Sequence, residues 1–283
     1  MASRNFILII LCVFALNGCS TTFLYNNLPW LADYWVDDYV DLDKQQSKQL
    51  KAEVAKLRRW HRTHALPQYR QLLIEIKAGI NKPIDVQQLL DWRAQSLVYW
   101  QDAVRKANDP ILELAVSLSA QQKQEFVENV SEKISRQLNE FTELSEQEKL
   151  EMRIEHMLNS YKNWLGKLSD AQVSLIEEAA LATASTKAHR FEYTQRRLDA
   201  LRNVFSLASS DELVFRAQLT DIIVNTEQFK SAQFIALSAI DNHTHANLQL
   251  RILTTLSAKQ QRHLIKEFDK WIDDIDTLIE DGD

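Results

Sequence analysis

The chain has 283 residues, of which 45% are hydrophobic and 25% charged, but only 4 are Gly, 4 Pro and 2 Cys. The hydrophobic share argues against intrinsic disorder, and the length is sufficient to bury a core. Because tight turns and sheets rely on Gly and Pro, their scarcity favours long helices. The net charge of −6 disfavours nucleic acid as a partner, since binding DNA or RNA needs a basic surface.

The first 18 residues are typical of a bacterial signal peptide. A short basic start is followed by an apolar run over 6–16, which is too short to cross a bilayer because a spanning helix needs about 20 residues. The sequence Leu16-Asn17-Gly18-Cys19 then resembles the lipobox of bacterial lipoproteins. This resemblance implies cleavage before Cys19 and acylation of that cysteine, and several acyl chains together hold a protein firmly on a membrane. The alternative is an ordinary signal-peptidase site that lies near Cys19 by chance.

The residue after Cys19 bears on the final location. Ser20 in place of Asp resembles lipoproteins of Gram-negative bacteria that are sorted to the outer membrane. We therefore expect the protein on the periplasmic face of that membrane.

Cleavage would leave residues 19–283, which we expect to form a single helical periplasmic domain. Cys12 is lost with the leader and Cys19 carries lipid, so no thiol nucleophile, disulfide or cysteine-bound metal is expected. Removal of Arg4 leaves 32 basic and 39 acidic residues, a net charge of 32 − 39 = −7. This balance also disfavours docking onto anionic lipids beyond the anchor.

Apolar residues recur at steps of three and four along the chain, which predicts an all-α fold, a multi-helix bundle of long capped helices. The clearest series start at Val86, Phe126, Leu150 and Leu264. The series from Val86 is Leu90, Arg93, Leu97, Trp100 and Val104. We expect Asp109-Pro110 to stop one helix, and Lys82-Pro83 to precede another that starts near Asp85.

Five copies of Leu-(Ser/Asp)-x-x-(Gln/Glu) predict helix starts. They lie at 42–46, 118–122, 144–148, 168–172 and 256–260. Each has the form of a capping box, in which the Ser or Asp side chain and the Gln or Glu side chain bond to each other's backbone N–H groups. The motif also resembles the Leu-Thr-x-x-Gln signature of small periplasmic chaperones, which hold unfolded clients in a cradle of helices. Capping chemistry alone is the simpler explanation.

The segment over about 25–42 is rich in aromatic and acidic residues. On a helix, Trp30, Tyr34 and Asp38 form one stripe, Asp33, Asp37 and Asp41 form another, and Trp35 and Tyr39 form a pair. We consider this segment a candidate surface for a peptide, a glycan strand or a basic helix, because amphipathic rings offer large contact areas. The simpler alternative is that the rings pack the first helix onto the bundle. The candidate partner-binding residues are Trp30, Tyr34, Trp35, Asp37, Asp38, Tyr39 and Asp41.

The same region resembles a family of uncharacterised proteobacterial helical lipoproteins. The shared segments are the lipobox, Tyr-Asn-Asn-x-x-Trp at 25–30, Asp-x-Tyr-x-Asp-Leu at 37–42, and Trp-His-Arg at 60–62 followed by Leu-Pro-x-Tyr at 66–69. The resemblance implies a helical envelope lipoprotein and carries no known activity with it.

No catalytic or metal-binding pattern is present, so we expect no enzyme, no cofactor and no metal site. Cleavage leaves only Gly79, Gly166 and Gly282, too few for a phosphate-binding loop. The His residues at 61, 64, 243 and 245 lack zinc-site spacing and are expected on the surface. The favoured function is a non-catalytic interaction or scaffold lipoprotein with an envelope-protein or cell-wall partner. The alternatives are a tethered periplasmic chaperone, and a cell-wall or lipid hydrolase without a readable motif.

Overall fold

The computed structural model describes residues 18–207 and 211–281, and the described chain is helical with no strand. The all-α prediction is confirmed. The helices are α2 (Gly18–Asn26), α3 (Leu28–Asp37), α4 (Lys44–Trp60), the π-helical turn η2 (His61–Ala65), α5 (Leu66–Gly79), α6 (Val86–Ser117), α7 (Ala120–Thr142), α8 (Glu146–Leu165), α9 (Asp170–Ala182), α10 (Lys187–Phe205), α11 (Glu212–Ile223), the 3-10 turn η4 (Thr226–Phe229), α12 (Ala232–Thr254) and α13 (Ala258–Glu280). The signal-peptide prediction for residues 1–18 falls almost entirely outside the described residues.

All five predicted capping boxes are present, with both of their hydrogen bonds. Their caps are Asp43, Ser119, Ser145, Ser169 and Ser257, which start α4, α7, α8, α9 and α13. A sixth start, at Asp85 before α6, has the side-chain cap without the reciprocal bond. Side chains therefore take over the role that Gly and Pro play at helix boundaries in other chains.

Four of the five boxes have Gln at the third helical position, and these glutamines meet in pairs. The amides of Gln46 and Gln122 bond to each other at 3.1 and 2.7 Å, and those of Gln172 and Gln260 do so at 3.2 and 2.7 Å. Each amide oxygen still accepts from the N–H of its own cap residue. Each pair thus joins the starts of two helices that are far apart in sequence.

Each paired amide also reaches across to the chain just before its partner's helix. Gln46 donates to the Ser117 carbonyl, Gln122 to that of Asp41, Gln260 to that of Lys167, and Gln172 to Thr255. Only an amide has both the acceptor that the box needs and the donors that the partner needs.

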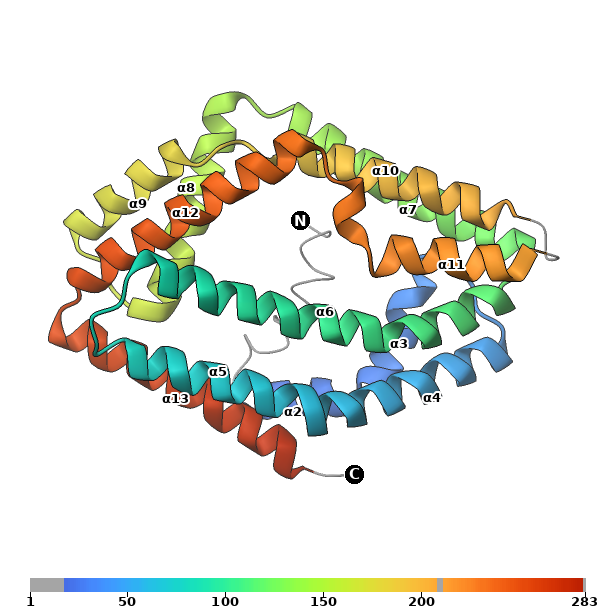
Figure 1. Cartoon of the computed structure of the whole chain (residues 1–283), viewed down its shortest axis with the longest axis horizontal. Coiled ribbons are helices and arrows are strands. Elements are labelled where there is room, and N and C mark those ends of the chain that lie inside the picture. The colour runs from blue at the N-terminus through green and yellow to red at the C-terminus, as the bar shows by residue number, and fades with distance from the viewer. Residues whose placement is uncertain (1–17, 208–210, 282–283) are drawn as a thin grey trace.

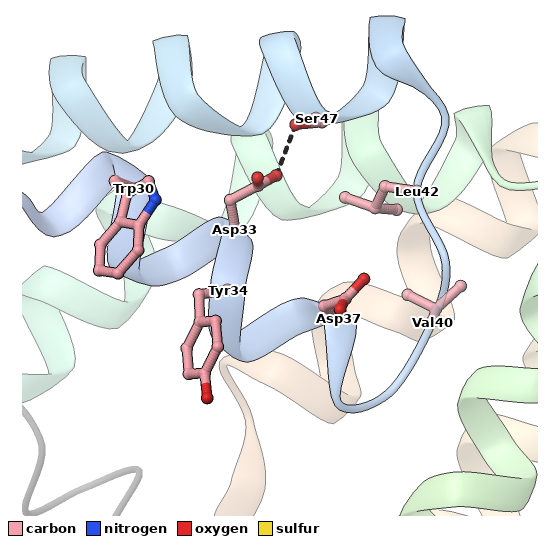
Figure 2. A pocket seen from close by; sticks show the side chains of 7 residues that line it. All are labelled: Trp30, Asp33, Tyr34, Asp37, Val40, Leu42 and Ser47. Carbon is pink, nitrogen blue, oxygen red and sulfur yellow. Dashed lines mark hydrogen bonds between the residues drawn. The ribbon is translucent and has the colours of Figure 1, made fainter.

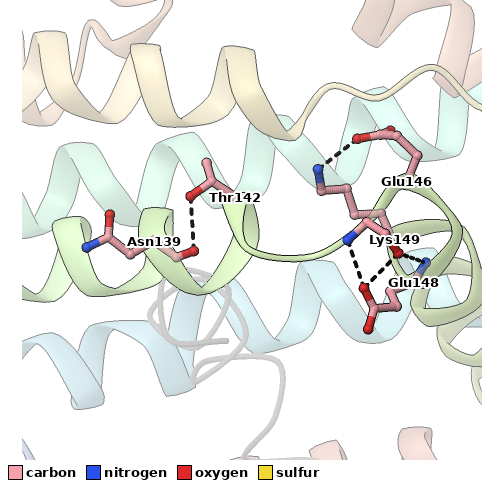
Figure 3. A network of polar contacts seen from close by, with 6 residues as sticks. Asn139, Thr142, Glu146, Glu148 and Lys149 are labelled. Carbon is pink, nitrogen blue, oxygen red and sulfur yellow. Dashed lines mark hydrogen bonds and ion pairs between the residues drawn. The ribbon is translucent and has the colours of Figure 1, made fainter.

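The fifth box, at the start of α8, has Glu and no such partner. The carboxylate of Glu148 bonds to the backbone N–H and the hydroxyl of Ser145, and Lys149 pairs with Glu146 beside it, as Figure 3 shows. The capping box without a partner is therefore the one that has Glu in place of Gln.

The prediction that Asp109-Pro110 ends a helix is wrong, because α6 continues through Pro110 to Ser117. An internal Pro costs about 3 kcal/mol through its missing N–H and its ring clash. Packing offsets this cost, since Leu112 and Ala115 are buried against α10 and α11. Asn108 also donates to the Thr220 hydroxyl at 3.2 Å. Tertiary contacts override the local signal.

The helices form an elongated body with α6 across its middle (Figure 1). One end gathers α8, α9 and α12, the other gathers α7, α10 and α11, and α5 lies along α13. One buried cluster joins α8, α9, α12 and α13, and a second joins α6, α10 and α11. A third cluster contains Tyr25, Leu66, Ile275 and Leu278, which come from α2, α5 and α13. Helix α2 is therefore part of the core.

The predicted apolar faces are largely the packed ones. Met157, Leu264 and Phe268 are buried in the first cluster, with Ile154, Tyr161 and Trp164 packed against it. The face predicted along α6 is interrupted at Leu97, which is 47% exposed.

Candidate functional site

The helix that contains Cys19 packs onto the body. Helix α2 begins at Gly18, although the side chains of residues 18–21 are not among those described. Six residues after Cys19, Tyr25 is only 4% exposed, and Leu24 and Leu28 pack against the same cluster. The chain after Cys19 is thus held to α5 and α13 by buried apolar contacts.

The Tyr25 side chain reaches the π-helical turn between α4 and α5. Its hydroxyl lies 3.0 Å from Nδ1 of His61 and donates to the Arg58 carbonyl at 3.2 Å. The His61 ring also contacts Tyr69, and burial lowers the pKa of His61 from 6.5 to about 4. The prediction that His61 lies on the surface is therefore wrong, because α2 covers it. A π-turn adds one residue to a helical turn, and such turns often occur at functional sites.

Two arginines complete this contact. Arg58 donates to the Asn26 carbonyl, and Arg62, which is buried, donates to the Asn26 side chain at 2.7 Å and lies over the Tyr25 ring. Segments 25–27 and 58–62 are thus bound to each other. Tyr25, Asn26, Arg58, His61 and Arg62 all act in packing, and sequence reasoning had not placed them together.

Helix α3 presents an exposed aromatic pair above a shallow pocket. Trp30 and Tyr34 are 58% and 60% exposed, and their rings stack with centroids 5.9 Å apart. The pocket has a volume of about 250 Å³. It is lined by Trp30, Asp33, Tyr34, Asp37, Val40, Leu42 and Ser47, which come from α3, the segment after it and the start of α4 (Figure 2).

The two carboxylates of the pocket differ. Asp33 accepts from the Ser47 hydroxyl at 2.6 Å and pairs with Lys51 at 2.8 Å. Burial raises the pKa of Asp33, but these two partners outweigh it and hold that pKa below its usual value. Asp37 is exposed and has no hydrogen-bond or ion-pair partner among the described residues. Asp33 therefore fastens α3 to α4, whereas Asp37 is available to a ligand.

The remaining candidate residues do not share this surface. Helix α3 ends at Asp37, so the predicted helical stripe through Asp41 and the Trp35–Tyr39 helical pair are wrong. Tyr39 instead packs on α7, where its ring contacts Phe126, its hydroxyl accepts from Lys133 at 2.7 Å and its carbonyl accepts from Asn129.

Of the others, Trp35 is half-buried, while Asp38 and Asp41 are exposed just beyond the helix. The Asp41 carbonyl accepts from Gln122. Beyond Asp38 the chain leaves the helix and passes beside the start of α7, where Gln122 bonds to it. Of the seven candidates, only Trp30, Tyr34 and Asp37 line the pocket. Asp33 and Ser47 were not among the candidates. The four-residue step from Asp33 to Asp37 was the signal for Asp33, and no pattern marks Ser47.

Within residues 18–207 and 211–281, no three His, Cys, Asp or Glu side chains lie close enough together to hold a metal ion. No helix of this part of the chain is both long and apolar enough to cross a bilayer.

These features define a protein whose described residues form an all-α bundle, with an aromatic and acidic pocket beside α3. The chain belongs to a family of unknown function (DUF6279), whose model matches residues 38–234, from the end of α3 into α12. No curated protein and no solved structure matches it. Trp30 and Tyr34 thus lie just before the matched region.

Proposed function

We propose that the protein is a lipid-anchored, non-catalytic interaction protein of the bacterial envelope, attached through Cys19. It would sit on the periplasmic face of the outer membrane of a Gram-negative bacterium, as the lipobox-like sequence and Ser20 imply. In this proposal it binds another envelope component through Trp30, Tyr34 and Asp37.

The observation that carries the proposal is the stacked, exposed Trp30–Tyr34 pair above its pocket. Large rings that need only two side-chain torsions fixed are preferred at binding surfaces. An exposed pair of this kind contributes only a few tenths of a kcal/mol to folding, roughly 0.2–0.5. Of the other rings of this segment, Tyr25 and Tyr39 are packed against the body and Trp35 is half-buried. The contrast between these rings and the exposed pair supports a role in binding for Trp30 and Tyr34.

The position of this pair also supports the proposal. Trp30 follows Cys19 by eleven residues, nearly all helical, so at 1.5 Å per residue the two lie within about 20 Å. A lipid at Cys19 would hold the pocket close to the membrane surface.

The chaperone alternative draws no support from the repeated Leu-(Ser/Asp)-x-x-Gln motif. Its glutamines are used in capping and in the two amide pairs. Binding of one envelope partner is therefore a simpler proposal than a chaperone role.

Photo-crosslinking in living cells tests the binding proposal. A photoreactive residue at Tyr34 should capture one dominant partner, and Trp30→Ala should abolish that product. The matched control is Leu181 on α9, which is 67% exposed and distant in sequence. Identical products from both positions, or none from Tyr34, would refute the binding proposal.

The anchor has a separate test. Cys19→Ala should abolish palmitate labelling and block lipoprotein processing. A correctly cleaved Cys19→Ala protein that stays in the membrane fraction would overturn it.

A further inference from the structure

We propose that the Trp30–Tyr34 pocket binds a lysine or arginine side chain of a basic segment in the partner protein. This inference rests on the proposed function and names the chemistry of the partner. It comes from the charges, ring faces and volume of the pocket.

The segment that forms most of the pocket is strongly acidic. From Asp33 to Asp43 the chain has five aspartates and no basic residue. Asp33 is neutralised by Lys51, and Asp43 caps α4. The carboxylates of Asp37, Asp38 and Asp41 have no partner within the described chain. An anionic ligand would be repelled, and a cation would be attracted.

The rings add a second preference for a cation. Elsewhere in the described chain, lysines and arginines lie over aromatic faces, for example Lys133 over Tyr39 at 4.4 Å and Lys187 over Phe141 at 4.1 Å. None of the cation–ring contacts in the described part of the chain involves Trp30 or Tyr34. Trp gives the strongest cation–π attraction among the aromatic residues. The two exposed rings thus offer faces of the kind that this chain occupies with its own cations at other places.

The dimensions fit one side chain. A pocket of about 250 Å³ is below the usual size of a small-molecule site, but it accommodates the end of one long side chain. Its apolar wall, Val40 and Leu42, suits the methylene stem of Lys or Arg, and Asp37 suits the charged end.

The test uses the acylated full-length protein in detergent. A fluorescein-labelled twelve-residue peptide of alternating Lys and Ser serves as the probe, and its affinity is measured by fluorescence anisotropy. We expect it to bind, and its affinity to fall as salt is raised. The same peptide with Glu in place of Lys should not bind.

Variants of the pocket sharpen the test. Trp30→Ala should weaken binding about fivefold, and Asp37→Asn about threefold, as expected for exposed cation–π and ionic contacts. The matched control is Glu155→Gln, which removes one exposed charge from α8 and should change the affinity by less than the pocket variants do.

Three results would overturn the proposal. One is an equal loss of affinity in Asp37→Asn and Glu155→Gln, which indicates general attraction to an acidic protein. Another is binding of an N-acetylglucosamine tetramer with no binding of the Lys peptide, which indicates a glycan site. The third is a partner captured through Tyr34 in cells while the Lys peptide fails to bind. In that case the proposed function stands and the basic-segment inference fails.

Discussion

The paired capping-box glutamines make a sharp prediction at Gln172. This side chain is fully buried and donates through Nε2 to the Gln260 amide oxygen at 3.2 Å and to the Thr255 hydroxyl at 3.2 Å. Gln172→Glu keeps the shape and the capping acceptor but removes the donor. A carboxylate oxygen then faces the amide oxygen of Gln260.

The cost follows from burial. Leaving a buried acceptor without its donor costs about 1–3 kcal/mol, and the added buried charge raises the total to about 3–5 kcal/mol. This is a large fraction of the 5–15 kcal/mol that is typical of a whole domain. Urea unfolding followed by circular dichroism at neutral pH measures the change.

The pH dependence of the stability of Gln172→Glu separates the effect of the added charge from that of any change in shape. Burial would raise the pKa of the new carboxyl in the folded state above its value in the unfolded chain. The penalty is therefore present at neutral pH and disappears as the pH falls through the folded pKa toward the unfolded one, since a protonated Glu again donates.

The control is Glu148→Gln, the reverse exchange at the box that has no partner. It should leave the urea midpoint nearly unchanged. A cost below about 1 kcal/mol for Gln172→Glu, or an equal loss in Glu148→Gln, would show that the amide pairing does not stabilise the fold.

Two further predictions concern the packing of α5 and α2. Gly79→Ala should destabilise the protein by about 1–3 kcal/mol, because the added Cβ would overlap the indole ring of Trp92. This loss is expected although Ala is the better helix former. Equal or higher stability of the variant in thermal unfolding would contradict the prediction. The pKa of His61 is about 4 in the folded chain, against 6.5 for an ordinary histidine. As the pH falls, the unfolded state therefore takes up a proton before the folded state does. The free energy of unfolding should fall by up to about 3 kcal/mol between pH 6.5 and pH 4. The fall should be smaller in His61→Gln, and equal pH profiles from urea titrations of the two proteins would refute the burial of this ring.

Local signals predicted most of the fold. The helix starts were readable because a capping box places both of its side chains within four residues of sequence. The packed faces of α8 and α13 were readable because helical spacing determines which residues share a side. Both signals are local, so neither depended on knowing which helices meet.

The parts that escaped prediction depend on contacts between distant segments. Gln172 and Gln260 are 88 residues apart, and no pattern in one sequence shows that two caps meet. Pro110 stays helical because of burial against α10 and α11. His61 is half-buried, with its Nε2 atom inaccessible, because α2 packs over its ring. In the candidate site, sequence placed Trp30, Tyr34 and Asp37 correctly on one helix, but it extended that helix through Tyr39 and Asp41 because it contained no signal for the turn.

The contacts of α2 also change how the family-like segments are interpreted. Tyr25 and Asn26 bind Arg58, His61 and Arg62, so the Tyr-Asn-Asn and Trp-His-Arg segments are two halves of one packing contact. Their recurrence in related chains would be explained by the fold without any shared ligand. It also follows that the chain after Cys19 is a packed helix and not a loose tether. If Cys19 carries lipid, this contact fixes how far the α3 pocket can move from the membrane, and weakening it should lengthen that reach without altering the pocket itself.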